Sequence, residues 1–247
     1  MSIQFDESIE DLQYEGYRII QKKDKFRFGM DAVLLANFVS NTNGKTVVDI
    51  GTGTGIIPIL IAAKTDVKKI LAVEVQGQMV EMANRSIKLN NLEDRIEVLN
   101  EDINNFGKIE GLGTYNIVVT NPPYMKKGNG LLNETYDVSI ARHELLCTFE
   151  DICYATNRIL KDGGELYLIH RTDRLVDILS CMRNEGIEPK EMQFIHPNMS
   201  KPPNLVLVKG RKGGNPELKI LPPLYVYDKD GNYTEEINRI YCRTEEL

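Results

Sequence analysis

Between residue 46 and about residue 210, short β-rich runs alternate with helical runs, and this alternation limits the fold more than any other feature. The predicted strands are rich in Val, Ile and Leu and cover residues 46–50, 69–74, 95–100, 115–120, 164–170 and 205–210. Strands that are apolar on both faces are typical of a parallel sheet covered by helices on each side. The pattern therefore predicts an α/β fold with a doubly wound, mostly parallel sheet.

The helical runs keep the 3.6-residue period of amphipathic helices. Helices are predicted to begin at residue 56 and to cover residues 76–90, 150–160 and 173–185. We expect Gly163–Gly164 to end the helix over residues 150–160. Gly186 is expected to close the last of these helices as the residue just beyond its end.

One domain is expected to hold most of the chain. A chain of 247 residues can bury roughly 70% of its surface, which is enough for one sizeable core. Residues 46–212 form the predicted domain, residues 1–45 an N-terminal extension that packs on it, and residues 213–247 a C-terminal tail that also packs on it. The tail is too short for an independent domain.

The composition excludes several classes of protein. The longest apolar stretch, residues 56–63, is far shorter than the ~18 residues that a membrane helix needs. The acidic first residues lack the basic and apolar regions of a signal peptide. The four cysteines have no C-x-x-C spacing and the three histidines are scattered. We therefore expect a cytoplasmic protein with reduced thiols, no membrane partner and no metal. No feature indicates an oligomeric state.

A glycine-rich loop follows the first predicted strand, in the segment VVDIGTGTGI. Asp49 lies near the end of this strand, and Gly51, Gly53 and Gly55 have the spacing G-x-G-x-G. Open α/β sheets bind ligands at the carboxyl ends of their strands, and glycines let the backbone lie close to the ligand. The spacing differs from the dinucleotide pattern G-x-G-x-x-G, and the absence of G-K-[ST] excludes a P-loop nucleotide site.

Acidic residues follow the next two predicted strands. Glu74 ends one strand, and its two carboxylate oxygens could accept both hydroxyl groups of a ribose. Asp102 follows the next strand, where it could accept a hydrogen bond from the exocyclic amine of adenine. The alternative for each acid is that it only caps the following helix. Together with the glycine loop, the two acids favour an adenosyl ligand.

The tetrapeptide Asn121-Pro122-Pro123-Tyr124 follows the strand over residues 115–120. An exocyclic amine or an amide nitrogen is a poor nucleophile because its lone pair is delocalised. The Asn121 side-chain oxygen and the Pro122 carbonyl could accept its two N–H bonds and direct the lone pair at an electrophile. Tyr124 could stack on a base. The alternative is a plain turn, since N-P and P-P are turn dipeptides.

With these motifs the sequence resembles the S-adenosylmethionine-dependent methyltransferases that have a seven-stranded Rossmann-like sheet. In this resemblance, residues 49–55 form the cofactor loop, Glu74 is the ribose acid, Asp102 is the adenine-side acid and residues 121–124 form the amino-methylating motif. The resemblance implies S-adenosyl-L-methionine as the cofactor. It also implies that Asn121, Pro122, Pro123 and Tyr124 form the catalytic site.

Two further segments, residues 26–38 and 141–152, are similar to the bacterial tRNA-1(Val) adenine-N6-methyltransferase family. That family methylates the adenine beside the anticodon. The resemblance implies that Asn121 and Pro122 orient the adenine N6 while Tyr124 stacks on the base. It also implies that residues 28–31 close over the methionine end of the cofactor. The alternative for residues 28–31 is an ordinary helix start.

The formal charge of the chain is −6, from 30 Lys and Arg against 36 Asp and Glu. This average argues against a nucleic-acid partner, but phosphates are bound by local clusters of Lys and Arg. Residues 18–31 carry a local charge of +3, and residues 125–133 and 192–216 contain no acid. We expect these three basic segments to converge around Asn121 and bind RNA, with Lys126 and Lys127 as substrate-binding residues.

The predicted function is therefore N-methylation of an exocyclic amine of a nucleic-acid base, adenine N6 in tRNA. One alternative is methylation of a glutamine amide in a protein such as a peptide release factor. Enzymes of that kind carry a larger N-terminal helical domain, whereas only 48 residues precede Asp49 here. A second alternative is a module that binds RNA or an adenosyl ligand without catalysis, which the presence of both Glu74 and Asn121 disfavours.

Overall fold

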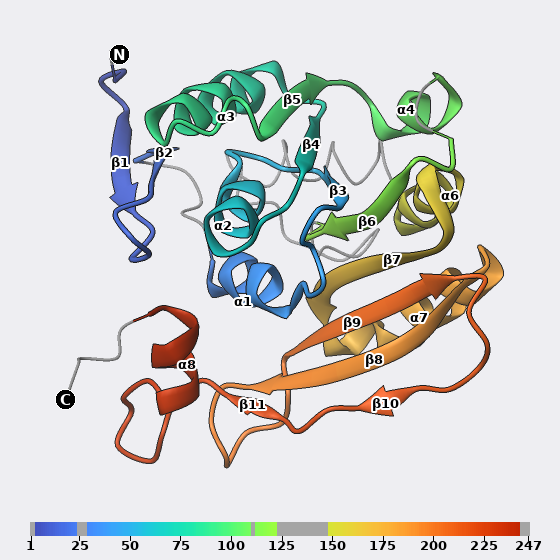
Figure 1. The fold of residues 1–247 in the computed structure, drawn as a ribbon. Coiled ribbons are helices and arrows are strands. Elements are labelled where there is room, and N and C mark those ends of the chain that lie inside the picture. Colours follow the sequence, from blue (N-terminus) through green and yellow to red (C-terminus); the bar gives the residue numbers. More distant parts are fainter. Residues whose placement is uncertain (1–2, 24–28, 110–111, 123–147, 243–247) are drawn as a thin grey trace, which may run out of the picture.

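The computed structural model describes residues 3–23, 29–109, 112–122 and 148–242 (Figure 1). A hairpin of β1 (Glu7–Asp11) and β2 (Arg18–Lys22) comes first. The remaining elements follow in the order α1 (Met30–Phe38), β3 (Thr46–Ile50), α2 (Ile56–Lys64), β4 (Lys69–Glu74), α3 (Gly77–Leu89), β5 (Ile96–Asn100), α4 (Ile103–Ile109), β6 (Tyr115–Thr120), α6 (Phe149–Ile159), β7 (Leu160–Arg171), the 3-10 turn η1 (Thr172–Arg174), α7 (Leu175–Asn184), β8 (Ile187–His196), β9 (Leu205–Lys212), β10 (Lys219–Ile220), β11 (Leu224–Tyr225) and α8 (Glu235–Ile240).

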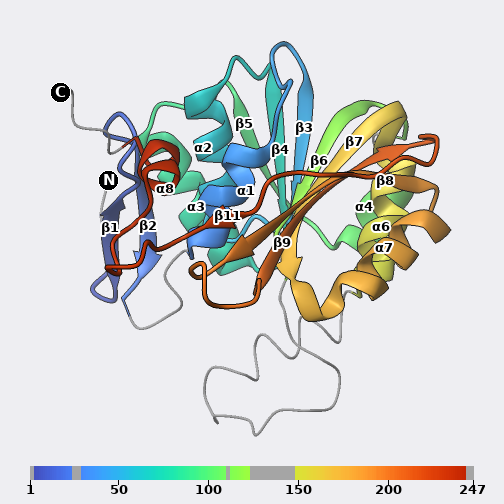
Figure 2. The same ribbon diagram turned by 90° about the horizontal axis from the view of Figure 1, so that it is seen from below.

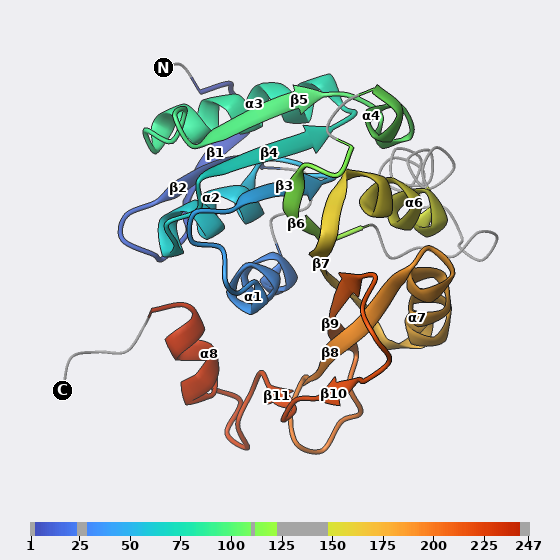
Figure 3. The same ribbon diagram turned by 45° about the vertical axis from the view of Figure 1, so that its right-hand side comes forward.

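Within the described residues, one large sheet has the strand order β10-β8-β9-β7-β6-β3-β4-β5, and β11 also pairs with β8. The strands from β7 to β5 are parallel, while β9 is antiparallel to both β7 and β8. The arrows of β3, β4 and β5 point the same way in Figure 3. These pairings confirm the predicted doubly wound, mostly parallel α/β sheet.

Helices cover both faces of the sheet, as Figure 2 shows. One apolar core lies between the sheet and the helices α1, α2 and α3. A second core lies on the opposite face, against α4, α6 and α7. The central strands β3 and β6 contribute side chains to both cores, which explains why their sequences are apolar without alternation.

Two details differ from the sequence prediction. The helix α6 already ends at Ile159, and Gly163–Gly164 lie within β7, so these glycines do not end the helix. In the pairing of β7 with β6, the register shifts between Leu160 and Glu165. The residues between these two positions, which include both glycines, form a bulge in β7. The predicted helix over residues 173–185 begins with the turn η1, and Gly186 follows α7 with a φ of 71°, as expected.

The pattern of the sequence does not predict β8, which pairs with β9 in an antiparallel hairpin. The register of this pairing shifts between Pro189 and Glu191. Because a bulge changes which side chains face the core, the apolar positions of β8 lose the regular spacing of two.

The described residues near both ends of the chain pack on this sheet-and-helix body. The short strands β10 and β11 extend the sheet beyond β8, and the buried side chain of Ile237 anchors α8. The amino group of Lys64, at the end of α2, donates to the carbonyl of Ile240. The boundaries at residues 45 and 212 remain predictions. In the described part of the chain, no helix is both long enough and apolar enough to cross a membrane.

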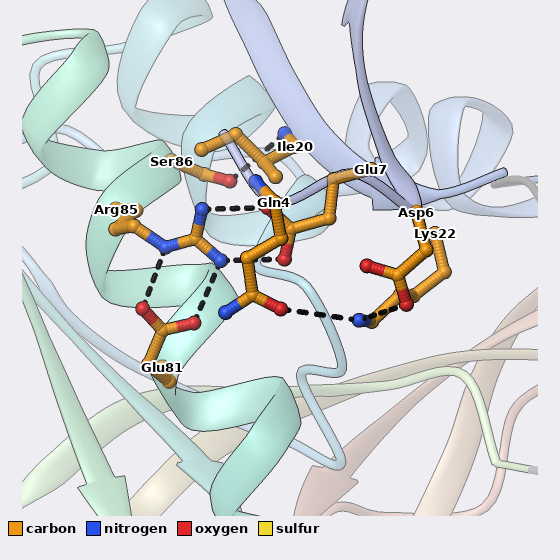
Figure 4. Close-up of polar contacts among 8 residues, drawn as sticks. All are labelled: Gln4, Asp6, Glu7, Ile20, Lys22, Glu81, Arg85 and Ser86. Atoms are coloured by element: carbon orange, nitrogen blue, oxygen red, sulfur yellow. Dashed lines mark hydrogen bonds and ion pairs between the residues drawn. The ribbon is translucent and has the colours of Figure 1, made fainter. Parts of the chain in front are cut away.

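A buried ion pair fastens the β1–β2 hairpin to α3 (Figure 4). The Glu7 side chain is fully buried, and its two oxygens accept from both terminal nitrogens of Arg85 at 2.7 Å. Arg85 also pairs with Glu81 one turn earlier on α3. The backbone N–H of Ile20 donates to the Ser86 hydroxyl at 3.0 Å. The Arg85 hydrogen bonds lower the pKa of Glu7 to about 2.

We expect Glu7→Gln to lower the free energy of unfolding at pH 7 by about 2 kcal/mol, because it breaks a bidentate buried pair. The pKa of Glu7 is depressed in the folded state, so the stability from this pair is present above pH ~4.5 and is lost as the pH falls toward 2. Urea titrations at several pH values should show wild type and variant converging in acid. Glu10→Gln, on the same strand, is the control. If the difference in the free energy of unfolding between wild type and Glu7→Gln were the same at pH 3 as at pH 7, the stabilising role of the Glu7–Arg85 pair would be contradicted.

Candidate functional site

The carboxyl ends of β3, β4, β5 and β6 meet at one edge of the sheet, because these strands are parallel. Ile50, the last residue of β3, pairs with Val73 of β4 on one side and with Thr120 of β6 on the other. The buried Thr120 hydroxyl donates to the Ile50 carbonyl at 3.1 Å. The register therefore brings Gly51 and Asn121, the residues that follow this pair, to the same place on the edge.

The glycine loop depends on backbone conformations that other residues rarely adopt. Gly51, Gly53 and Gly55 have φ angles of 73°, 58° and 88°. A Cβ atom on Gly51 or Gly53 would meet nothing within 4 Å in the part of the chain that the structure describes, so the loop leaves open space where a ligand could lie against its backbone. A Cβ on Gly55 would lie 3.4 Å from the Cβ of Ala83, so this glycine lets α2 begin close to α3.

Glu74 ties the glycine loop to the end of β4. Its side chain is buried, and one carboxylate oxygen accepts from the backbone N–H of Gly53 at 3.0 Å. The other oxygen accepts from the N–H of Gln76, just before α3, at 2.9 Å. Each carboxylate oxygen has a further lone pair, so Glu74 can hold the loop and still accept hydroxyl groups of a ligand.

Asp49 carries a buried carboxyl group without a hydrogen-bond partner among the described residues. It is fully buried on β3, and neither of its oxygens has a hydrogen-bond partner among the described residues. Burial raises the pKa of Asp49 to about 7, the Thr52 side chain opposes this increase, and the negative charge of Glu74 adds to it. Because an unsatisfied buried carboxyl group is costly, a ligand that brings a donor or a positive charge would stabilise it.

The open glycine loop, Glu74 and the buried carboxyl group of Asp49 together fit the expected cofactor. S-adenosylmethionine carries ribose hydroxyls, which are donors for Glu74, and positive charge on its sulfonium and ammonium groups. Both oxygens of Asp49 can accept from donors or neutralise such a charge. The residues at this edge therefore suit the group that the sequence implies.

The end of β5 contributes Asp102 and Asn100. One oxygen of Asp102 accepts from the N–H of Asn104 at 2.8 Å, so this acid does cap the start of α4. Whether it also contacts adenine remains a prediction. The Asn100 side chain donates to the carbonyls of Glu74 and Val75 at 2.9 and 3.0 Å and fixes the loop that follows β4.

Asn100 and Thr120 also shape the site, and neither was predicted from the sequence. Both are polar residues at the last position of an otherwise largely apolar strand. A polar side chain in that position of a parallel strand is the signal that could have identified them.

Only part of the tetrapeptide falls within the described residues. Asn121 is half-buried and Pro122 is buried, directly after β6. Other residues with expected roles lie outside the described residues, namely Pro123, Tyr124, Lys126, Lys127, Phe28 and most of the segment 141–152. Their predicted roles remain predictions.

The expected convergence of the basic segments on Asn121 is wrong for most cations of residues 192–216. Lys209 pairs with Glu165 at 3.0 Å, and Lys212 donates to two backbone carbonyls behind α6. Because β9 runs antiparallel to β7, its end lies at the opposite edge of the sheet from Asn121. In the first basic segment, Lys22 pairs with Asp6 within the hairpin region.

The histidine closest in sequence to the end of β7 is a structural residue. His170 is buried, its Nδ1 accepts from the N–H of Arg171 at 2.8 Å, and its ring contacts Phe149 edge to face. Burial lowers its pKa to about 4, so it is neutral at physiological pH. Across the described ranges, no group of three or more His, Cys, Asp or Glu side chains could hold a metal ion.

A family model and several relatives that match this chain are all methyltransferases. A family model described as the methyltransferase small domain matches residues 23–179. A relative from Phocaeicola vulgatus, named tRNA1(Val) (adenine(37)-N6)-methyltransferase, is 28% identical over 195 residues, which cover 79% of this chain and 81% of the relative. A relative of the same name from Haemophilus influenzae strain 86-028NP is 25% identical over 227 residues, which cover 90% of this chain and 92% of the relative.

Solved structures share the fold. A protein from Agrobacterium tumefaciens described as a predicted O-methyltransferase superposes with a TM-score of 0.70 at 25% identity and covers 86% of this chain and 96% of its own. TYW2 from P. horikoshii, solved in complex with MeSAdo, has a TM-score of 0.60 at 16% identity and covers 85% of this chain and 73% of its own. At its low identity, the second similarity supports the α/β fold alone.

Proposed function

Because the chain belongs to the methyltransferase small domain family, we propose that it transfers a methyl group from S-adenosylmethionine to the exocyclic N6 amine of adenine in tRNA. The observation that carries this proposal is the pairing of Ile50 with Thr120, since it brings Asn121 beside the glycine loop. The names of the relatives, which specify adenine N6 in tRNA, support the choice of substrate.

The cofactor would be held by the residues at the carboxyl edge of the sheet. The backbone of Gly51 and Gly53 lines its binding surface, Glu74 accepts from the ribose hydroxyls, and Asp49 faces its positive charge. The bound cofactor supplies an electrophilic methyl group on a sulfonium sulfur. Asp102 accepts from the adenine amine of the cofactor in this proposal.

Asn121 and Pro122 prepare the target nitrogen. The side-chain oxygen of Asn121 accepts one N–H of the adenine amine, and the carbonyl of Pro122 accepts the other. These hydrogen bonds draw the nitrogen toward tetrahedral geometry and direct its lone pair at the methyl carbon. As the nitrogen–carbon bond formed, the methyl–sulfur bond would break, and its electron pair would stay on the sulfur, which would leave as a neutral thioether. The methylated nitrogen is positively charged and acidic, so it releases one proton to water, and no strong general base is needed.

Tyr124, Lys126 and Lys127 complete the proposed substrate site. Tyr124 stacks on the target base, a contact of about 1–3 kcal/mol. The lysines contact the phosphates of the RNA, whose affinity should therefore fall as salt increases.

The class of methyl acceptor can be tested directly. The protein is incubated with S-adenosylmethionine labelled in its methyl group and with separate pools of tRNA, rRNA, DNA and protein from a bacterium that lacks this enzyme. We expect label in the tRNA pool alone. Label in the protein pool would favour glutamine methylation, which uses the same two acceptors on an amide. An absence of label in every pool would favour the module without catalysis.

A further inference from the structure

The turn between β8 and β9, residues 197–204, lies at the same edge of the sheet as Asn121. β7 is parallel to β6, so its last residue, Arg171, lies at the carboxyl edge. β9 is antiparallel to β7, and its first residue, Leu205, pairs with Arg171. We call residues 197–204 the edge loop. Figure 2 shows it on the same side of the molecule as the start of α7.

Hydrogen bonds hold the edge loop in one conformation. The hydroxyl of Thr172 donates to the carbonyl of Pro203 at 2.9 Å, and the N–H of Thr172 donates to the carbonyl of Asn204 at 3.2 Å. Within the loop, the Asn198 side chain accepts from the N–H and the hydroxyl of Ser200. The two bonds of Thr172 join the edge loop to η1, so the two segments form one preorganised surface.

This surface exposes large apolar side chains. Met199, in the edge loop, is 82% exposed, and Val176, in the first turn of α7, is 77% exposed. A single exposed apolar residue needs no explanation. Here, however, both side chains come from segments that are bonded to each other through Thr172, beside the candidate site. A binding partner would remove them from water.

The charge of the surface favours a polyanion as that partner. Lys201 is exposed in the edge loop, and Arg171 has a side chain that is 55% exposed. Asp173 lies 3.3 Å from Arg171, and Asp177 lies 2.8 Å from Arg174. Within each of these two pairs the opposite charges cancel. Lys201 stands apart from them, in a stretch of the chain without acids, residues 192–216.

We propose that the edge loop and the start of α7 form an RNA-docking surface beside the target base. Met199 packs against the face of a nucleoside that neighbours the target adenine, and Lys201 contacts a flanking phosphate. This inference rests on the proposed function and adds to it the residues that select the RNA around the adenine. It also explains why a rigid turn carries an exposed methionine two residues before an exposed lysine.

The test compares Lys201→Glu and Met199→Ala with variants matched in kind at the opposite edge of the sheet. Lys69→Glu changes an exposed lysine at the start of β4, and Leu112→Ala changes a 52% exposed side chain just before β6. For each protein, fluorescence anisotropy gives the Kd for unfractionated tRNA at several salt concentrations. Calorimetry gives the Kd for S-adenosylmethionine, and thermal unfolding checks the fold.

We expect Lys201→Glu to weaken tRNA binding about 10-fold and to reduce the salt slope by about 1. Met199→Ala should weaken it about 5-fold with an unchanged salt slope, since the lost contact is apolar. The cofactor Kd and the melting temperature should match wild type in both. The matched variants should bind tRNA as wild type does.

Two outcomes would overturn the inference. If wild type binds and methylates tRNA while Lys201→Glu and Met199→Ala bind it equally well, the edge loop does not contact the RNA and the proposed function stands. If wild type binds no tRNA and instead methylates protein, the proposed function fails together with the inference.

Discussion

Replacing Asn121 by alanine should lower the rate of methyl transfer by about 10²–10³-fold while the affinity for S-adenosylmethionine stays within about twofold of wild type. The side-chain oxygen of Asn121 would accept a hydrogen bond that strengthens as the target nitrogen becomes tetrahedral. Removal of one such preorganised group costs a rate factor of this size in other enzymes. Single-turnover kinetics with saturating tRNA measures the effect on the chemical step.

The control for Asn121→Ala is Asn121→Asp, which keeps an acceptor oxygen of the same reach. We expect this variant to retain more activity than the alanine variant. Because Asn121 is half-buried, both variants should first be shown to melt as wild type does. A single-turnover rate for Asn121→Ala within tenfold of wild type would exclude the proposed role of its side chain.

Asp49→Asn should remove a large pH dependence of stability and weaken cofactor binding. The pKa of Asp49 is raised to about 7 in the folded protein, above its value of about 3.9 in the unfolded chain. The carboxyl group therefore destabilises the fold progressively as the pH rises from about 4 to 7 and loses its proton. The full effect is up to about 4 kcal/mol. Asparagine cannot ionise, so the free energy of unfolding of the variant should not fall with pH for this reason.

Urea titrations of wild type and Asp49→Asn between pH 4 and 8 measure the difference. Asp66→Asn, at an exposed acid, is the matched control. S-adenosylmethionine should stabilise wild type more than the Asp49 variant at pH 7, because ligand binding adds stability according to its affinity. Parallel stability curves for wild type and Asp49→Asn would contradict the assignment of Asp49 as an unpaired buried acid.

The fold could be predicted from local sequence where the strands are apolar throughout. The predicted strand over residues 115–120 has the bounds of β6, and the strand over residues 46–50 has those of β3. The prediction failed for β8 and for the glycines before residue 165, where bulges interrupt the pairing. Bulges depend on the partner strand, so a pattern within one segment does not reveal them.

The residue types at the candidate site could be predicted, but their contacts could not. The spacing of the glycines and the position of Glu74 after a strand identified the loop and its acid. That Glu74 accepts from the N–H of Gly53 depends on how β3 and β4 are aligned. In the same way, only the direction of β9 shows that Lys212 lies at the opposite edge of the sheet from Asn121 while Lys201 lies on the same edge.

The central claim, that Asn121 and its neighbours methylate adenine at N6, is tested most directly by identifying the modified nucleoside. tRNA labelled by the enzyme is digested to nucleosides and separated by chromatography with mass detection. We expect all of the label in N6-methyladenosine, and about 10²–10³-fold less of it with Asn121→Ala at the same reaction time. Label in a ring-methylated adenosine or on a ribose oxygen would contradict the claim, because those acceptors have no exocyclic N–H pair for Asn121 and Pro122 to hold.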